Sequence, residues 1–337
     1  MKLNQPVKNI IDADDIFNVK PGGFTALSLQ VFRFQYENNL VYQQFCNTLG
    51  THMRSIEHIS QIPFLPISFF KSHPITTTDF EPEVIFESSG TTQTNRSMHR
   101  VKAIDLYKKS FNKSFQMFYG DPSEWCIIAL LPSYLERGSS SLVMMADQLI
   151  QKTGHPQSGF YLDEFEKLHT TLQQLEARRQ KTLLLGVTFA LLDFAEKYPL
   201  QLRSTTVMVT GGMKGRREEL TPGELEDILC TQFKLTQVHS EYGMTELLSQ
   251  AYSRGKGIFN CPPWMKILLR EEDDPLMVKV AGESIVRGAV NIIDLANIYS
   301  CSFIASDDAG KLYPDQSFQV LGRLDNSDIR GCSLLAI

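Results

Sequence analysis

The sequence predicts an α/β fold with a mainly parallel sheet, followed by a smaller β-rich lobe. Between residues 125 and 242, apolar runs suited to buried strands alternate with amphipathic stretches long enough for helices. From about residue 258 the pattern changes to shorter β-rich pieces. Strands that alternate with helices are typical of βαβ units, in which helices cover a parallel sheet. The change near residue 258 therefore marks the start of the second lobe.

The composition is that of a globular chain with a substantial core. The chain has 337 residues, of which 42% are hydrophobic and 21% charged, and this excludes disordered, collagen-like and coiled-coil classes. Lysine and arginine number 33 against 38 aspartates and glutamates, a net charge of −5. Such a chain offers no basic surface for nucleic acid or anionic lipid, so we expect neither as a partner.

The cysteines and the N-terminus indicate a cytoplasmic protein. The six cysteines, scattered without a CxxC pair or a Cys/His cluster, are Cys46, Cys126, Cys230, Cys261, Cys301 and Cys332. This spacing argues against a zinc site and against a disulfide framework. Acidic residues occupy the N-terminal stretch where a signal peptide would need an apolar run. No apolar run approaches the roughly 20 residues that cross a bilayer, so we expect no membrane span.

We expect four regions along the chain. They are a helical N-terminal region (1–83), an α/β core (84–257), a β-rich lobe (258–320) and a hinge-like turn with a short tail (321–337). In the first region, residues 26–50 have apolar residues at helical spacing and stop at a glycine. Residues 61–74 carry three prolines without a regular period, which is typical of a connector that packs through its aromatic side chains.

Within the α/β core and the β-rich lobe, the spacing of apolar residues predicts the position of each strand and helix. Strands are predicted at 84–86, 125–131, 182–187, 206–210, 235–239, 265–269, 277–280 and 289–293. Helices are predicted at 104–118, 141–151, 165–179, 189–198 and 222–233.

The first motif with chemical meaning follows the first core strand. It reads Ser88, Ser89, Gly90, Thr91 and Thr92. A turn of this composition presents N–H and O–H groups that suit a polyphosphate. A Ser/Thr-rich turn that caps the next helix is the simpler interpretation of the motif alone. The segment lacks the lysine of a Walker loop, which disfavours a P-loop NTPase.

The second motif lies where open α/β sheets bind ligands, beyond the carboxyl end of a strand. Tyr242 can stack on a flat ring, Gly243 allows close approach, Thr245 can donate to phosphate and Glu246 can hold Mg²⁺. Without the other motifs, residues 242–246 are equally well explained as the acidic and aromatic start of a helix. His99, soon after the first motif, either lines the same pocket or is an exposed histidine at a helix start.

The third motif combines an acidic segment with a later Gly-Arg turn. Asp307 can accept both hydroxyls of a ribose, and Arg323, after Gly322, can bring a guanidinium to a phosphate. Each half by itself is also an ordinary turn.

The order of these motifs resembles that of the adenylate-forming superfamily of acyl-CoA synthetases and luciferases. The resemblance covers most of residues 84–331 and implies the large-domain fold of that superfamily, with ATP and Mg²⁺ as cofactors. By this resemblance, Gly211 and Gly212 correspond to the glycine pair near the adenine. Residues 242–246 correspond to the nucleotide-binding loop, in which Glu246 binds the metal. The resemblance also makes Asp307 the ribose-binding aspartate.

The departures from the superfamily pattern point to one branch of it. Gln93, Thr94, Asn95 and Arg96 stand where ordinary members have glycine and Pro-Lys-Gly. The chain stops at Ile337, so we expect it to lack most of the usual C-terminal domain and the catalytic lysine of that domain. These features, with the ending IRGCSLLAI, resemble the LuxE-type acyl-protein synthetases of bacterial bioluminescence.

That resemblance implies a reaction and a partner. The family activates a fatty acid with ATP and carries the acyl group on a cysteine near its C-terminus, the place that Cys332 occupies here. An acyl reductase or acyltransferase would then receive the acyl group. Without the family context, Cys332 would be interpreted as a small buried apolar residue beside Leu334 and Leu335.

Two other functions remain open at this point. One is a ligase that delivers acyl groups directly to CoA or a carrier thiol. The other is a non-catalytic subunit that binds nucleotide or acyl groups. Glu246 and Asp307 argue against the second, because a scaffold needs neither carboxylate.

Overall fold

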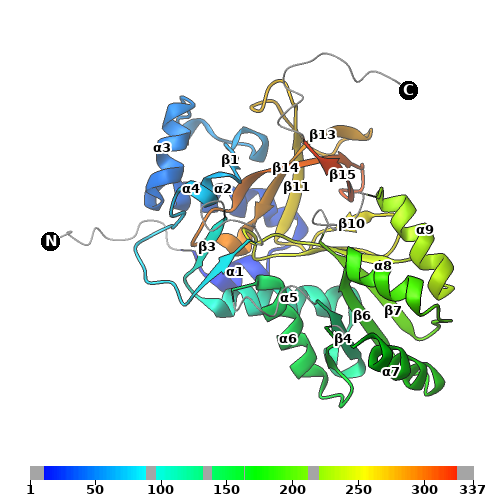
Figure 1. Cartoon of the computed structure of the whole chain (residues 1–337). Coiled ribbons are helices and arrows are strands. Elements are labelled where there is room, and N and C mark those ends of the chain that lie inside the picture. The colour runs from blue at the N-terminus through cyan, green and yellow to red at the C-terminus, as the bar shows by residue number, and fades with distance from the viewer. Residues whose placement is uncertain (1–10, 89–95, 132–138, 163, 212–219, 325–337) are drawn as a thin grey trace.

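One large sheet runs through the molecule (Figure 1). The computed structural model describes residues 11–88, 96–131, 139–162, 164–211 and 220–324. The strands in these ranges are β1 (Leu65–Pro66), β2 (Val84–Glu87), β3 (Met98–Val101), β4 (Cys126–Leu130), β5 (Gly159–Phe160), β6 (Thr182–Val187), β7 (Thr205–Thr210), β8 (His239–Tyr242), β9 (Ala251–Ser253), β10 (Ile258–Asn260), β11 (Met265–Arg270), β12 (Val278–Lys279), β13 (Val286–Asp294), β14 (Phe303–Leu312) and β15 (Phe318–Arg323). The main sheet has the order β12-β11-β13-β14-β15-β10-β9-β8-β7-β6-β4-β5, with β1 beside β14, while β2 and β3 form a separate hairpin.

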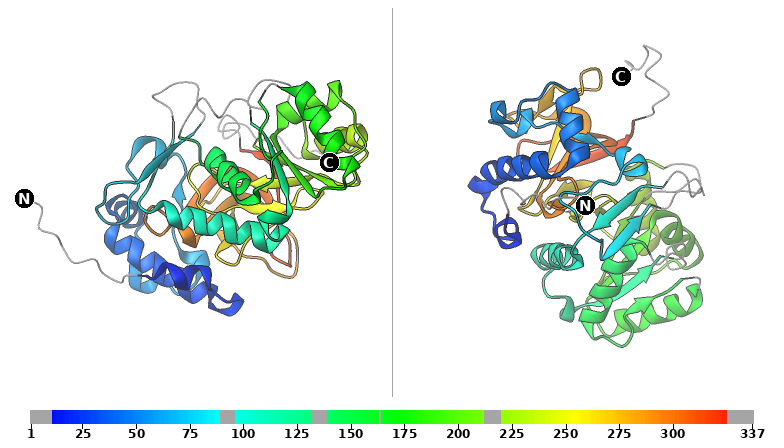
Figure 2. Two further views of the ribbon diagram at one scale, coloured as in Figure 1. Left: turned by 90° about the horizontal axis from the view of Figure 1, so that it is seen from below. Right: turned by 90° about the vertical axis from the view of Figure 1, so that its left-hand side faces the viewer.

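The strands β8, β7, β6, β4 and β5 are parallel neighbours and make up the parallel half of the sheet. Every residue of β4 and β6 is buried, as continuous apolar runs require when both faces of a sheet are covered. The helices around this half are α5 (Ile104–Tyr119), α6 (Ser141–Thr153), α7 (Phe165–Ala177), α8 (Thr188–Lys197) and α9 (Pro222–Phe233), as Figures 1 and 2 show. The predicted α/β fold is confirmed.

Apart from β1, which pairs in parallel with β14, the remaining strands of the sheet run antiparallel and continue it from β8 through β9 and β10. The longest of them are β13 and β14, which pair with each other and with β11 and β15. The β-rich pattern predicted from about residue 258 therefore corresponds to real strands. They extend the parallel sheet rather than forming a sheet of their own.

The N-terminal part is helical, with α1 (Ala13–Phe17), α2 (Phe24–Asn38), α3 (Leu40–Thr48) and the single turn α4 (Phe69–Ser72). The stretch predicted as helical over 26–50 is two helices, because Asn39 is extended at φ −115° and ψ 103°. The side chain of Asn39 caps α3 by accepting from the Tyr42 N–H at 3.0 Å. Asparagine favours this position because its side chain satisfies an otherwise unpaired N–H of the new helix.

One strand lies later in the chain than its pattern suggests. The prediction placed it at 235–239, but β8 begins at His239 and ends at Tyr242. Pairing with β7 decides this, because Met208 lies opposite His239 and Thr210 opposite Glu241. Among the described residues, no helix is long and apolar enough to cross a membrane.

Candidate active site

The hairpin of β2 and β3 holds the two ends of the predicted phosphate loop together. The Ser88 N–H donates to the Ser97 carbonyl at 3.1 Å, and the Ser97 N–H donates to Ser88 Oγ at 2.9 Å. Arg96 pairs with Glu87, with Nη1 3.2 Å from Oε2. The hairpin therefore presents Ser88 and Ser97 side by side. Four predicted residues of the loop lie outside the described residues: Ser89, Gly90, Thr91 and Thr92.

Glu246 lies against this hairpin. Its side chain is buried, and burial raises the pKa of its carboxyl. A hydrogen bond with the Ser97 side chain and the positive charges of Lys71 and Arg323 act in the opposite direction and lower that pKa. Ser97, which bonds to Ser88 of the first motif, thus meets Glu246 of the second motif in space.

The loop after β8 is held through its backbone by two buried side chains. His99 Nδ1 lies 2.8 Å from the Thr245 carbonyl oxygen, and Asn297 Nδ2 donates to the Glu246 carbonyl at 2.7 Å. Because a carbonyl only accepts, Nδ1 of His99 carries the proton. Burial lowers the pKa of His99 to about 4, so the ring is neutral at neutral pH. His99 is neither exposed nor at a helix start: it lies on β3 and supports the loop.

Tyr242 connects the end of β8 to β14. Its hydroxyl donates to Asp308 Oδ2 at 2.8 Å, and its ring packs against Phe259 and Phe318. Burial raises the pKa of Asp308, which lies inside the protein. The predicted ribose ligand Asp307 is the neighbouring residue and is exposed. It lies within β14 rather than after a strand, because β14 continues to pair with β15 through Asp308 and Arg323.

Arg323, Gly211 and Gly243 complete the described part of the candidate site. Arg323 is exposed at the end of β15. Gly211 follows β7 with φ +67°, a conformation that favours glycine, and its carbonyl accepts from Thr188 Oγ1 at 2.8 Å. The pairing of β7 with β8 ends at Thr210 and Glu241, the residues that precede Gly211 and Tyr242.

Packing inside the protein favours glycine at position 243. A Cβ at this position would lie 2.4 Å from Glu241 Oε1. Glu241 is buried and accepts a hydrogen bond from Thr210 Oγ1, so its carboxyl cannot easily move aside.

The structure thus brings together Glu246 and Arg323, connects Ser88 to Glu246 through Ser97, and places Tyr242 beside the strand of Asp307. Gly212 and Cys332, like the four loop residues, lie outside the described ranges. Sequence reasoning missed Lys71, Ser97, Asn297 and Asp308. No local pattern marks them, although Asp308 was visible as the second acid of the third motif.

The donor set at Glu246 fits Mg²⁺. Within the described residues, no three His, Cys, Asp or Glu side chains gather as a metal site. Mg²⁺ commonly takes only one or two protein carboxylates and completes its shell with water and substrate phosphates. A buried carboxylate beside the ends of a hydroxyl-rich loop suits that arrangement. A cavity of about 340 Å³, lined by Thr25, His58 and Lys266 among others, is built from other residues and is not part of this site.

The comparison with solved structures decides the fold family. A crystal structure of 2-hydroxyisobutyryl-CoA ligase with 2-HIB-AMP and CoA superposes with a TM-score of 0.65 at 12% identity, covering 91% of this chain and 70% of that one. The same enzyme in its postadenylation state, with 2-HIB-AMP, gives 0.63 at 13% identity, covering 96% and 74%. The chain has the adenylate-forming fold. The large-domain fold that the motif order implied is confirmed.

The sequence comparison agrees with this fold. The long-chain-fatty-acid–luciferin-component ligase of Vibrio harveyi is 23% identical over 327 residues, which are 90% of this chain and 84% of that protein. No family model matches the chain.

Proposed function

We propose that this protein uses ATP to activate a carboxylic acid as an acyl adenylate. Its similarity to a fatty-acid ligase over 90% of the chain and its adenylate-forming fold support this. The observation that carries the proposal is the meeting of Ser97 with Glu246, which puts the ends of the hydroxyl-rich loop beside a buried carboxylate. A site of this kind suits a metal-bound polyphosphate.

In the activation step, a carboxylate oxygen of the acid attacks the α-phosphorus of ATP. The bond from that phosphorus to the bridging oxygen breaks, and pyrophosphate leaves with the electron pair, so no proton is transferred. Ser88 and the loop after it donate to phosphate oxygens, and Arg323 stabilises the charge that develops on the leaving group. Glu246 would hold Mg²⁺, which neutralises phosphate charge when bound.

The nucleoside is assigned to the other half of the site. Tyr242 ends β8, Gly243 and Thr245 follow it, and Gly211 follows the neighbouring strand β7, so these residues would contact the adenine and the α-phosphate. By the family resemblance, Gly212 is also assigned to the adenine. Asp307 would accept the ribose hydroxyls, since it is exposed on β14 next to the residue that Tyr242 contacts.

The second step transfers the acyl group to a thiol, and Cys332 is the proposed acceptor. Its thiolate sulfur would attack the acyl carbonyl carbon, the bond from that carbon to the phosphate oxygen would break, and AMP would leave; the thiol proton passes to solvent. The described cysteines are poor candidates, because burial raises the pKa of each of them: Cys46 and Cys261 to about 12, Cys126 to about 11, and Cys230 and Cys301 likewise upward.

A fatty acid is the proposed substrate, by similarity to the Vibrio harveyi ligase. An acyl reductase or acyltransferase is the proposed partner that removes the acyl group. Direct transfer to CoA is the second candidate, because the solved neighbour that binds CoA has the same fold.

The test combines pyrophosphate exchange with intact-mass measurement. With MgATP and a panel of fatty and aryl acids, we expect acid-dependent exchange of labelled pyrophosphate into ATP and a covalent acyl adduct. Cys332→Ser should keep the exchange within about twofold and lose the adduct, because adenylation does not need the thiol. Cys230→Ser, at a half-buried cysteine on α9, should keep both.

Each alternative outcome has one meaning. Absence of exchange with every acid contradicts the activation step. An adduct that survives in Cys332→Ser places the acyl group on another residue, and formation of acyl-CoA without any adduct supports direct transfer. Thermal stabilisation by MgATP without AMP production would indicate a non-catalytic nucleotide-binding subunit.

A further inference from the structure

The connector 61–74 reaches the candidate site, although its sequence suggests only packing. Its strand β1 pairs in parallel with β14, with Leu65 opposite Ile304 and Pro66 opposite Ala305. The Ile67 N–H continues this contact by donating to the Ala305 carbonyl at 2.9 Å. The connector is therefore fixed beside the strand that carries Asp307.

The next turn, α4, is anchored from the opposite side. Phe70 is fully buried, and its ring meets the His99 ring edge-on at 5.8 Å between centroids. His99 lies on β3 and holds the carbonyl of Thr245, one residue before Glu246. The backbone of residue 71 thus has a defined place relative to the loop after β8.

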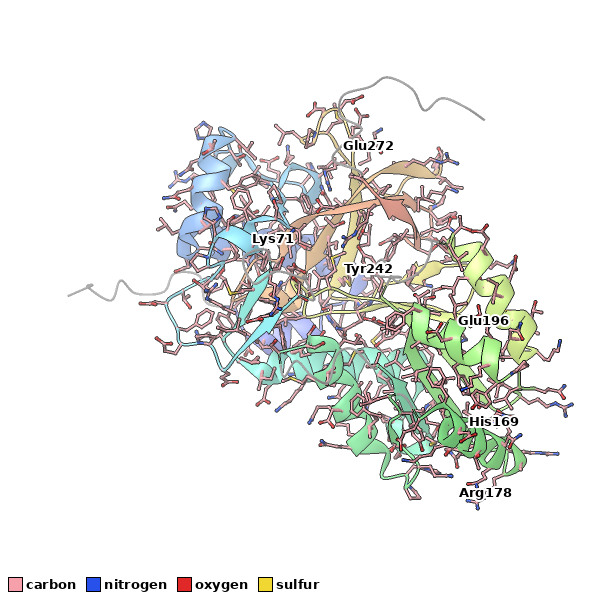
Figure 3. All side chains as sticks on the ribbon, in the orientation of Figure 1. Lys71, His169, Arg178, Glu196, Tyr242 and Glu272 are labelled. Atoms are coloured by element: carbon pink, nitrogen blue, oxygen red, sulfur yellow. The ribbon has the colours of Figure 1, made fainter. Side chains whose placement is uncertain are left out.

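Lys71 follows Phe70 on α4, and its side chain is exposed (Figure 3). Its ammonium is close enough to Glu246 to lower the pKa of that buried carboxyl. Among the described residues, several lysines pair with a carboxylate within 4.0 Å, including Lys108 with Asp105, but Lys71 does not. The charge of Lys71 therefore acts on the candidate metal carboxylate, and within the described ranges Lys71 forms no ion pair with a carboxylate of its own.

The hydroxyl-rich loop lacks a cation that could serve the same purpose. Residues 88–95 contain no lysine or arginine. Arg96, the first cation after it, pairs with Glu87. A polyphosphate bound beside Glu246 carries several negative charges, and one magnesium ion neutralises only part of them. The cations whose charge lowers the pKa of the Glu246 carboxyl are Lys71 and Arg323.

We propose that Lys71 binds the β- and γ-phosphates of ATP from the side of α4, near the candidate metal carboxylate Glu246. The inference rests on the proposed function, since it needs ATP in this site. It makes Lys71 a further catalytic residue, because the phosphates that it contacts belong to the leaving pyrophosphate. A cation there favours departure of the leaving group as its charge increases.

The experiment compares three variants of the full chain with wild type. Lys71→Met removes the charge at similar length, Lys71→Arg keeps it, and Lys108→Met removes the charge of a half-buried lysine on α5 as the control. Affinities for ATP and for AMP, each with Mg²⁺ and without acid, are measured by isothermal titration calorimetry. Acid-dependent pyrophosphate exchange then gives kcat and KM for ATP.

We expect Lys71→Met to weaken ATP binding about 30-fold and AMP binding less than threefold, because AMP lacks the β- and γ-phosphates. The value of kcat/KM for ATP in the exchange reaction should fall by about 100-fold. Lys71→Arg should restore both within about fivefold, and Lys108→Met should remain within about twofold of wild type. Melting temperatures should stay unchanged, since Lys71 is exposed.

The outcomes separate this inference from the proposed function. If wild type exchanges pyrophosphate and Lys71→Met behaves like Lys108→Met, the role of Lys71 is wrong while adenylation stands. Equal weakening of ATP and AMP binding would also overturn it. If wild type binds ATP more tightly than Lys71→Met does but never exchanges, the phosphate contact stands and the proposed reaction fails. Absence of ATP binding to wild type overturns both.

Discussion

The parallel half of the sheet is stabilised by apolar packing, whereas the antiparallel half is joined to the candidate site by buried polar side chains. In the parallel half, β4 and β6 are buried along their whole length and consist almost entirely of apolar residues. In the antiparallel half, buried polar side chains join the strands to the rest of the molecule: Asp308 to Tyr242, and Asp294 to the backbone of Leu248 and Ser249.

This difference explains where the candidate site lies. Apolar burial is non-directional and supplies stability, whereas buried polar groups require defined partners and so impose geometry. The segment between β8 and β9, which carries Glu246, is held by directional bonds from β3, β13 and the residues after β13. The parallel half therefore provides a rigid platform, and the polar junction determines the positions of the reacting groups.

The largest expected loss of stability tests the polar junction, which is the set of hydrogen bonds from Asp294, Asn297 and His99 to the segment between β8 and β9. Asp294 is fully buried and accepts from the N–H groups of Leu248, Ser249 and Ala296 and from Ser249 Oγ. Asp294→Ala leaves these donors without an acceptor, and we expect the free energy of unfolding to fall by about 4 kcal/mol in urea denaturation.

The control for this prediction is Leu184→Ala, at an equally buried position of β6. It should cost about 3 kcal/mol through lost apolar burial and a cavity. A loss below about 1 kcal/mol for Asp294→Ala, with Leu184→Ala behaving as expected, would mean that the polar junction does not stabilise the fold.

The second prediction concerns Glu241, a buried carboxyl that receives a hydrogen bond from Thr210 and lies near Tyr107, Tyr119 and Tyr252. Burial raises the pKa of Glu241 from 4.5 to about 7. The folded protein therefore binds this proton more tightly than the unfolded chain, and stability falls as the pH rises through that window. Glu241→Gln removes the titration, so its stability relative to wild type should rise by about 3 kcal/mol between pH 4.5 and pH 8.

Urea denaturation at both pH values measures this change. Glu166→Gln, at an exposed glutamate of α7, is the control and should differ from wild type by about 0.5 kcal/mol or less at each pH. A pH-independent difference for Glu241→Gln would show that Glu241 stays ionised in the folded protein.

The smallest expected change in stability comes from substituting two glycines, one in a crowded position and one in an open position. Gly243→Ala puts a Cβ 2.4 Å from Glu241 Oε1, whereas a Cβ at Gly223 in the first turn of α9 has no neighbour within 4 Å. Gly243→Ala should lower the free energy of unfolding by about 1.5 kcal/mol, and Gly223→Ala should raise it by about 0.5 kcal/mol. Thermal and urea unfolding measure both. Equal effects would indicate that the loop after β8 adjusts freely.

The parallel half was predictable because its signals are local. The continuous apolar run over 182–187 and the amphipathic stretch over 222–233 match β6 and α9 at both ends. In α9, Thr221 and Glu224 form a capping box that the sequence itself encodes. The order of the motifs was equally visible, and it led to the adenylate-forming fold.

Other features depended on contacts between distant residues. The bounds of β8 follow from its register with β7, and the interruption at Asn39 comes with contacts to Thr77 and Ser300 far along the chain. Lys71 carries no motif, and only the packing of Phe70 against His99 brings it toward Glu246.

The sequence by itself determined the secondary structure of the parallel half and the types of residue available for chemistry, because periodicity and motif order are properties of neighbouring positions. The tertiary structure alone decided which of these residues face one another. Ser97, which precedes β3, meets Glu246, and the Tyr242 hydroxyl at the end of β8 donates to Asp308 of β14 rather than to its neighbour Asp307. Such pairings depend on strand order and sheet geometry, which no local pattern in the chain encodes.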